Sequence, residues 1–303
     1  MKLFFYHDIF LNHNLNIDVL RKMSEESEIV LVSDNEDQTI TYVQLNRLEK
    51  KNAFNTILTE ALTNGLLKAE QSKSRVIILH GGDDCFSSGI DLGMMAGGDP
   101  SMMIHAKTVI PPDPSDRRMM RYYTWNFMQR TQEIIQKMEK PVIARITGPC
   151  MGYAFEIAVN CDYRFCLENS VFSMVESKIG IIPDTGGTIG LTRLVGVAHA
   201  KDIVLTGRRF DGNEAYRMGV VNGVAKTVEE LDAMIKSYTD EIIDSAPLAV
   251  GLTKKAIDWC YGKSTYLGLE LETIVSSILQ NTKDVTTGGI ARMQKKAPQW
   301  RSR

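Results

Sequence analysis

Three acidic residues could move protons, because each stands in a segment that is otherwise apolar or rich in glycine. Glu156 ends the segment GPCMGYAFE, and Glu176 and Asp184 both lie within FSMVESKIGIIPDTGG. Apolar surroundings raise the pKa of a carboxyl group, which suits it to donate a proton near neutral pH. Structural roles are also open to them: complementing a helix dipole for Glu156, pairing with a cation for Glu176, and starting a helix for Asp184.

Two glycine-containing turns could supply backbone N–H groups close to these acids. In CFSSGIDL (residues 85–92), a glycine after two small residues lets the chain turn sharply and aim an N–H group into a cleft. The turn before Glu156 lies between a predicted strand and a predicted helix, where free N–H groups and the helix dipole together favour an anion. For the first turn, a purely structural role is the alternative.

Alternating strands and helices are needed to position these turns. Residues 28–46 predict an antiparallel hairpin, and Asn55 predicts the start of a helix over 56–71. Short apolar runs predict buried strands at 75–80 (RVIILH), 141–146 (PVIARI) and 162–167 (DYRFCL), with helices at 116–139 and 152–160 between them. The later segments read as helices: 187–194, 197–205, 211–218, 228–244, 248–261 and 266–281. This order predicts an α/β core that leads into a helical C-terminal section.

A segment from Gly93 to about Asp116 is rich in glycine, methionine and proline. Flexible thioether side chains in such a segment could line an apolar pocket of variable shape. An ordinary surface loop is the alternative.

Composition and charge argue against several classes of protein. The 303 residues carry a formal net charge of −2 without a basic cluster, so we expect no nucleic-acid partner. The five cysteines show no CxxC spacing, which favours free thiols in a reducing compartment over a disulfide framework or a metal site. No secretory signal and no apolar run of about 18 residues is present, so we expect a cytoplasmic protein without membrane insertion. Neither GxGxxG nor GxSxG occurs, which disfavours a dinucleotide-binding dehydrogenase and a serine hydrolase.

An ordered series of motifs over residues 28–300 resembles the enoyl-CoA hydratase/isomerase (crotonase) family. The matching blocks are FSSGIDL, KPVIARITG, GYAFEIAVNCD, VESKIGIIPDTGGT, LTRLVG and LTGRRFDGNEAYRMGVVNGV. Six ordered motifs are far more specific than one. The resemblance implies a crotonase (ClpP-like) α/β fold, with a repeated β-β-α spiral core over residues 27–225. It also implies a C-terminal helical section over 226–303 that serves as a lid or oligomerises. We expect residues 1–26 to be an added N-terminal arm.

The resemblance also implies roles for particular residues. The N–H groups of Ile90 and Tyr153 would hold the thioester oxygen in an oxyanion hole, and Glu156 and Glu176 would act as base toward water and acid toward Cα. The residues that would contact substrate beside them are Ser88, Gly89, Asp91, Leu92 and Gly152. The expected partner is an acyl-CoA thioester, with coenzyme A as part of the substrate, no other cofactor and no metal. Homotrimers or dimers of trimers are usual in the family.

Two residues depart from the pattern of the hydratases in this family. Asp184 stands where hydratases commonly carry glycine and dienoyl-CoA isomerases carry aspartate, although those isomerases typically have aspartate at the position of Glu156. Tyr153 replaces the middle glycine of the usual three, and a positive φ at this position would cost a tyrosine roughly 1 kcal/mol. Enoyl-CoA hydration is therefore the first hypothesis. Double-bond isomerisation is the second, and a non-catalytic acyl-CoA-binding scaffold is the third.

Overall fold

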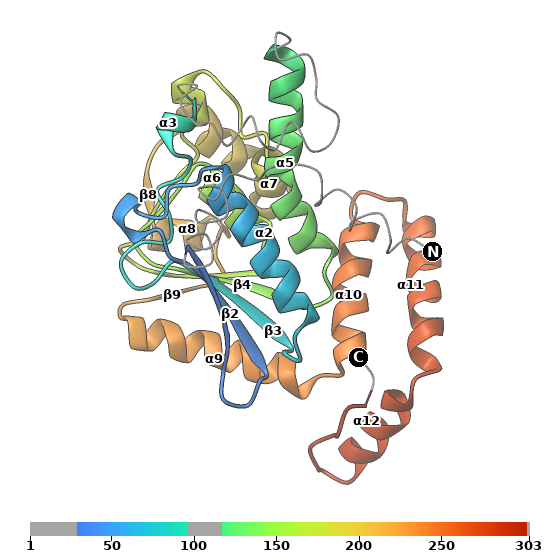
Figure 1. The fold of residues 1–303 in the computed structure, drawn as a ribbon. Coiled ribbons are helices and arrows are strands. Elements are labelled where there is room, and N and C mark those ends of the chain that lie inside the picture. Colours follow the sequence, from blue (N-terminus) through green and yellow to red (C-terminus); the bar gives the residue numbers. More distant parts are fainter. Residues whose placement is uncertain (1–28, 96–116, 302–303) are drawn as a thin grey trace, which may run out of the picture.

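A computed structural model of the chain describes residues 29–95 and 117–301, and the side chains of 29–93 and 126–301. Nine strands form two sheets (Figure 1). The strands are β1 (Val30–Asp34), β2 (Ile40–Leu45), β3 (Val76–His80), β4 (Val142–Ile146), β5 (Pro149–Met151), β6 (Tyr163–Leu167), β7 (Val171–Ser173), β8 (Phe210–Asp211) and β9 (Gly223–Ala225). The helices are η1 (Leu48–Lys50), α2 (Thr56–Gln71), α3 (Leu92–Met95), α5 (Arg117–Lys137), α6 (Tyr153–Val159), η2 (Glu176–Ile179), α7 (Gly187–Thr206), α8 (Gly212–Arg217), α9 (Val228–Asp244), α10 (Pro247–Cys260), α11 (Thr265–Gln280) and α12 (Lys283–Met293).

The large sheet has the strand order β1-β2-β3-β4-β6-β9, and only the β1–β2 pair is antiparallel. This pair is the predicted hairpin. Its turn is held by the side chain of Asn35, which accepts hydrogen bonds from the N–H groups of Thr39 and Ile40. A small sheet, β5-β7-β8, receives the chain directly after β4 and β6. The repeated step from a long strand to a short strand and then to a helix confirms the predicted β-β-α core.

Each face of the large sheet carries its own apolar core. On one face, α2 and α5 cover the main cluster, which includes Leu62, Ile77 and Ala144. On the other face, α9 packs over a smaller cluster through Leu231 and Ile235 (Figure 1). The strands β3 and β4 are therefore almost wholly buried, as their apolar sequences predict. α9 therefore packs on the large sheet, and the division of the chain at residue 226 stays a prediction.

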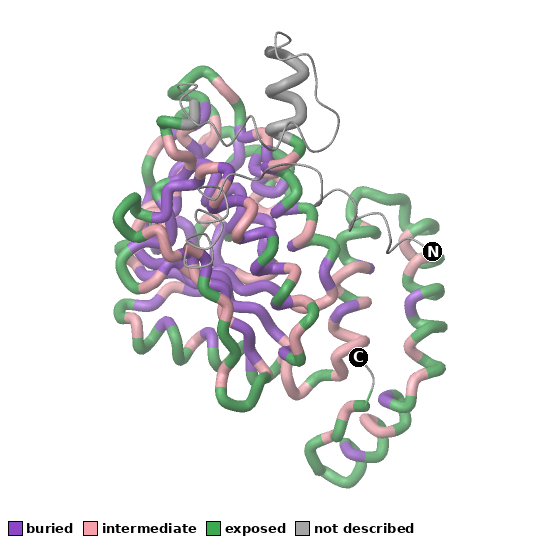
Figure 2. Tube along the Cα trace, viewed as in Figure 1, coloured by how far each residue is buried: buried purple, intermediate pink, exposed green. Residues whose placement is uncertain are grey.

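The helices α10, α11 and α12 extend from this core; α11 and α12 are largely exposed, whereas most of α10 is half-buried (Figure 2). Lys254 anchors α10 through an ion pair with Asp162 at 2.7 Å and hydrogen bonds to the carbonyls of Ile135 and Lys140. Large apolar side chains nevertheless face solvent on these helices, among them Ile257, Tyr266, Leu269, Ile274, Ile278 and Met293. A lid or an oligomer interface on this section stays a prediction.

The sequence also predicts most helix ends. The predicted helices at 187–194 and 197–205 are the two parts of α7, which Gly196 separates with non-helical dihedral angles, φ 76° and ψ 168°. α12 and the short strands β5, β7, β8 and β9 were not predicted from the residues. No helix of the described ranges is long and apolar enough to cross a membrane.

Candidate active site

Glu156 lies in the first turn of α6, where the sequence places it, and is 2% exposed. Its Oε2 atom accepts hydrogen bonds from the backbone N–H groups of Thr185 at 2.8 Å and Gly187 at 2.9 Å. The carboxyl group is thus held by the turn that begins α7, some 30 residues later in the chain. Because α6 and α7 pack against each other, this contact belongs to the core of the fold rather than to a mobile surface.

Glu176 is the first residue of η2 and is 6% exposed. It lies beside the start of α6, since a Cβ atom placed on Gly152 would be 2.9 Å from its Oε1 atom. Its Oε2 atom is buried and makes no hydrogen bond to any described residue. Glu176 therefore presents a carboxyl oxygen that is withdrawn from water and available to a reacting group.

Burial and the negative charge of a neighbouring acid raise the pKa of each of these two acids. The pKa of Glu156 is raised to about 8, mainly by burial and then by the charge of Glu176, and the hydrogen bonds from Gly187 and Thr185 offset only part of the rise. The pKa of Glu176 is raised to about 7 by burial, with a contribution from the charge of Asp184. Such a pair titrates as a unit and keeps a proton near neutral pH.

The two predicted N–H donors lie on neighbouring turns. Gly89 and Gly152 both have positive φ, 95° and 50°, and a Cβ atom on Gly89 would be 2.6 Å from the carbonyl oxygen of Met151. Only glycine permits this close approach of two backbones. Neither the N–H group of Ile90 nor that of Tyr153 donates a hydrogen bond to another described residue. The structure thus brings two unused donors to the turn that also borders Glu176.

Local pairing explains why the N–H group of Ile90 is unused. The carbonyl of Gly89 accepts from the N–H group of Phe54, and the N–H group of Asp91 donates to the carbonyl of Phe54, both at 2.7 Å. In this parallel bridge the residue between the two contacts points its own N–H group to the opposite side. The N–H group of Ile90 therefore points away from Phe54.

Tyr153 does not strain the turn. The positive φ falls on Gly152, whereas Tyr153 begins α6 and is not among the described residues with positive φ. Its ring is buried, meets Phe54 edge-on with ring centres 5.0 Å apart, and its hydroxyl group donates to the carbonyl of Met128 at 2.9 Å. The tyrosine thus fills the core behind the turn and leaves its backbone N–H group available.

The other predicted site residues are Asp184, near Glu176, and three residues of the turn that contains Ile90. Asp184 is half-buried near Glu176, and Gly186 rather than Asp184 occupies the N-cap position of α7. Asp91 forms an ion pair with Arg47 at 2.9 Å, which lowers the pKa of its carboxyl group and ties the Ile90 turn to the segment after β2. Ser88 and Leu92 are exposed at the edge of that turn.

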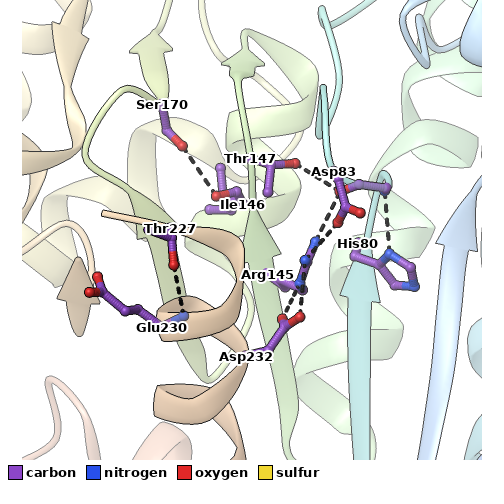
Figure 3. A network of polar contacts seen from close by, with 10 residues as sticks. His80, Asp83, Arg145, Ile146, Thr147, Ser170, Thr227, Glu230 and Asp232 are labelled. Carbon is purple, nitrogen blue, oxygen red and sulfur yellow. Dashed lines mark hydrogen bonds and ion pairs between the residues drawn. The ribbon is translucent and has the colours of Figure 1, made fainter. Parts of the chain in front are cut away.

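Behind the turns, buried polar residues connect the strand ends, and sequence reasoning gave these residues no role. Arg145 on β4 is 7% exposed; it donates to the carbonyl of Gly82 and forms ion pairs with Asp83 and with Asp232 on α9 (Figure 3). Thr147 donates to the same carbonyl at 2.8 Å. An arginine inside the apolar run PVIARI is the signal that could have indicated this network.

Asn52 also holds backbone carbonyl groups of the chain that follows β3. Its side-chain amide donates to the carbonyls of Gly81, Cys85 and Phe86, each at 3.1 Å, and its oxygen accepts from the N–H group of Arg47. It is wholly buried. The chain between β3 and Ile90 is therefore fixed at several carbonyl groups, which sets the direction of the Ile90 turn.

The predicted methionine-rich pocket lining lies mainly outside the described residues, which omit 96–116. Within the described ranges, no cluster of three or more histidine, cysteine or acidic residues could hold a metal ion.

Comparison with known proteins links this geometry to one family. The sequence model described as "Enoyl-CoA hydratase/isomerase" matches residues 35–111 and 115–303. A protein named probable enoyl-CoA hydratase 2, mitochondrial, from Arabidopsis thaliana is 32% identical over 264 residues, which cover 86% of this chain and 81% of the relative. A peroxisomal Delta(3,5)-Delta(2,4)-dienoyl-CoA isomerase from the same plant is 29% identical over 279 residues, covering 92% and 98%. The crystal structure of an enoyl-CoA hydratase from Bacillus anthracis superposes with a TM-score of 0.78 at 30% identity, covering 90% and 98%.

We predict that replacing Glu156 by glutamine makes the protein more stable, relative to wild type, as the pH rises. The pKa of Glu156 rises from 4.5 to about 8 on folding, so between these values the unfolded chain has lost a proton that the folded chain keeps. This group's contribution to the free energy of unfolding is constant below about pH 4.5, falls up to about pH 8 and is constant above it. A tenfold change in proton affinity corresponds to about 1.4 kcal/mol, so the variant should gain on the order of 3 kcal/mol over wild type between pH 5 and pH 8.5.

Urea denaturation at the two pH values measures this gain. Glu133→Gln, at an exposed glutamate of α5, serves as the matched control and should show no such gain. If the free energies of unfolding of Glu156→Gln and wild type differed by the same amount at both pH values, Glu156 would be ionised like an ordinary surface acid.

Proposed function

The chain belongs to the enoyl-CoA hydratase/isomerase family, and from that premise we propose that it adds water across the 2,3 double bond of an enoyl-CoA thioester. The observation that carries the proposal is the buried pair Glu156 and Glu176, whose pKa values lie near neutrality, beside two unused backbone N–H groups. Acids with perturbed pKa values in such a setting cluster at working sites.

In the proposed reaction the thioester oxygen accepts hydrogen bonds from the N–H groups of Ile90 and Tyr153. Attack at Cβ moves negative charge onto this oxygen as an enolate forms. Fixed backbone donors stabilise such charge without reorganising, and one donor typically contributes about 3 kcal/mol in related chemistry. Gly89 and Gly152 contribute by letting the two turns approach, and Asp91 by holding the first turn through Arg47.

The acid pair then handles two protons. Glu156 takes a proton from water as the water oxygen bonds to Cβ, and Glu176 gives a proton to Cα as the enolate collapses. The active form is the pair that carries one proton in total, on Glu176. The raised pKa values of both groups keep a proton on the pair near neutral pH, and because the pKa of Glu156 is the higher of the two, that proton must pass to Glu176 before water attacks. The N–H groups of Thr185 and Gly187 orient Glu156 for its part in the reaction.

A second candidate function is the isomerisation of a dienoyl-CoA by proton transfer without water. The specific observation in its favour is Asp184, whose charge acts on Glu176 and which could receive or return a proton along the chain. The similarity to a dienoyl-CoA isomerase agrees with it. A non-catalytic scaffold is least favoured, because Tyr153 leaves its N–H group free and the acid pair is intact.

We further propose a homotrimer or a dimer of trimers, because α10, α11 and α12 expose large apolar side chains that another subunit would cover. Coenzyme A is part of the substrate, and we propose no other cofactor. The cytoplasmic location expected from the sequence stays a prediction, since the two plant relatives are named as mitochondrial and peroxisomal.

We predict that Glu156→Gln and Glu176→Gln each lower kcat for 2-enoyl-CoA hydration by about 10²- to 10⁴-fold, the usual contribution of a general acid or base. KM should change little, because the N–H donors still bind the thioester. Loss of the enoyl absorbance of crotonyl-CoA and of longer enoyl-CoAs measures both constants. Glu229→Gln, at an exposed glutamate on α9, is the control and should retain full activity. Hydration by both active-site variants at the wild-type rate would contradict the assigned roles.

We predict that Asp184→Asn separates the two candidate reactions. In a hydratase it removes a negative charge beside Glu176 and lowers the pKa of that acid, so the alkaline limb of kcat/KM moves to lower pH while hydration persists. In an isomerase the same substitution removes a proton carrier, so isomerisation should be lost. Wild-type isomerase should convert a 3,5-dienoyl-CoA in deuterated water into a labelled, unhydrated 2,4-dienoyl product. A wild-type protein that makes this product and no hydroxyacyl-CoA would replace the first proposal by the second.

A further inference from the structure

One buried amide on α5 makes no hydrogen bond of normal geometry within the part of the chain that the structure describes. Gln132 is 3% exposed, and neither its Nε2 nor its Oε1 atom makes a hydrogen bond to a described residue. The Tyr153 hydroxyl group is near enough for Gln132 to act weakly on the pKa of Tyr153, but it donates its hydrogen to the carbonyl of Met128 at 2.9 Å. Buried polar groups without partners are rare in native proteins and cost free energy, so such a group calls for a functional explanation.

Two neighbouring glutamines on the same side of α5 show what a structural role looks like. The Nε2 atom of Gln129 donates to the carbonyl of Asp184, and that of Gln136 donates to Oδ1 of Asn160, both at 2.6 Å. Both side chains tie α5 to the elements around Glu156. Gln132 lies between them along the helix and makes no such contact.

A second unpartnered group borders the same space. Gln132 and Thr185 both line a pocket of about 490 Å³ between α5 and residues 182–189. Thr185 is 4% exposed, and its hydroxyl group makes no hydrogen bond of normal geometry to a described residue, although it lies near enough to Glu156 to help lower the pKa of that acid. Its backbone N–H group is one of the two that hold Glu156. The pocket is therefore lined by two polar side chains without a hydrogen bond of normal geometry to a described residue, and one of them belongs to the residue whose N–H group holds Glu156.

The lining of this pocket limits what can bind there. It contains Glu133 and Asp184 and no lysine or arginine among the described residues, so an anionic group is disfavoured. Ile182, Pro183 and Ile189 provide apolar surface for methylene groups. Ile90 and Tyr153, the proposed thioester donors, do not line it. Because the backbone N–H group of Thr185 holds Glu156, the pocket adjoins the acid side of the site rather than the thioester donors.

Building on the hydratase proposal, we propose that Gln132 and Thr185 form a subsite for an uncharged oxygen substituent, a hydroxyl or carbonyl group, on the acyl chain beyond Cβ. The Gln132 amide can donate to either group and accept from a hydroxyl, and the Thr185 hydroxyl can do both. A plain alkyl chain leaves all of these groups unsatisfied. Sites built to hydrogen-bond a substrate group discriminate strongly against analogues that lack it.

Three enoyl-CoAs of equal chain length test the subsite: 2-hexenoyl-CoA and its 5-hydroxy and 5-oxo derivatives. Wild type should favour at least one oxygenated substrate in kcat/KM by at least tenfold, and the preferred derivative identifies the group. Gln132→Met, which keeps the side-chain length without hydrogen bonding, should abolish or reverse the preference. Gln71→Met, at an exposed glutamine of α2 outside the pocket, is the control and should keep it. Equal kcat/KM values for the three substrates in wild type would overturn the proposal.

Two measurements keep the test independent of turnover and therefore of the hydratase proposal. Calorimetric binding of hexanoyl-CoA and of its 5-hydroxy and 5-oxo derivatives should show the same preference in wild type and its loss in Gln132→Met. Thermal unfolding without ligand should leave Gln132→Met at least as stable as wild type, while Gln136→Met, which loses a hydrogen bond, melts lower. Equal binding of all three esters, or a Gln132→Met protein that melts as low as Gln136→Met, would show that Gln132 is a structural residue. A binding preference without hydration would uphold the subsite and reject the hydratase proposal alone.

Discussion

Two carboxyl groups that share one buried space cannot both ionise freely, and the arrangement around them follows from that constraint. Burial alone would favour the neutral form of Glu156 and Glu176. The fold offsets part of this through the N–H groups of Thr185 and Gly187, which stabilise the charged form of Glu156 and fix its direction. The balance leaves both groups titrating near neutral pH, where one can give a proton and the other can take one.

The spiral core makes this possible because it brings distant turns together. Glu156 begins a helix after β5, Glu176 follows β7, and the two N–H donors come from turns after β3 and β5. Neighbouring parallel strands end at the same side of the sheet, so turns that are more than sixty residues apart in sequence meet there. Arg145 and Asn52 then fix the carbonyls behind the first turn, so its donor does not depend on a flexible loop.

The residues themselves predict much of this arrangement. Apolar runs such as RVIILH and PVIARI indicate buried strands because few other segments avoid polar residues so fully, and Glu156 falls in the predicted first turn of its helix. The three-residue strands could not be predicted, because pairing with a distant partner defines them and no periodicity does. The direction of the Tyr153 ring and the isolation of Gln132 also depend on side chains from other elements. Each becomes visible only when α5 is placed against α6 and α7.

The central claim is that one thioester lies between the N–H groups of Ile90 and Tyr153 and between the two glutamates. The structure of the protein bound to a non-reacting enoyl-CoA analogue tests it most directly. We expect the thioester oxygen at about 2.7–3.1 Å from both nitrogen atoms, with Cα nearest Glu176 and Cβ nearest Glu156. A thioester oxygen that contacts neither N–H group, or an acyl chain that passes outside the glutamate pair, would contradict the account.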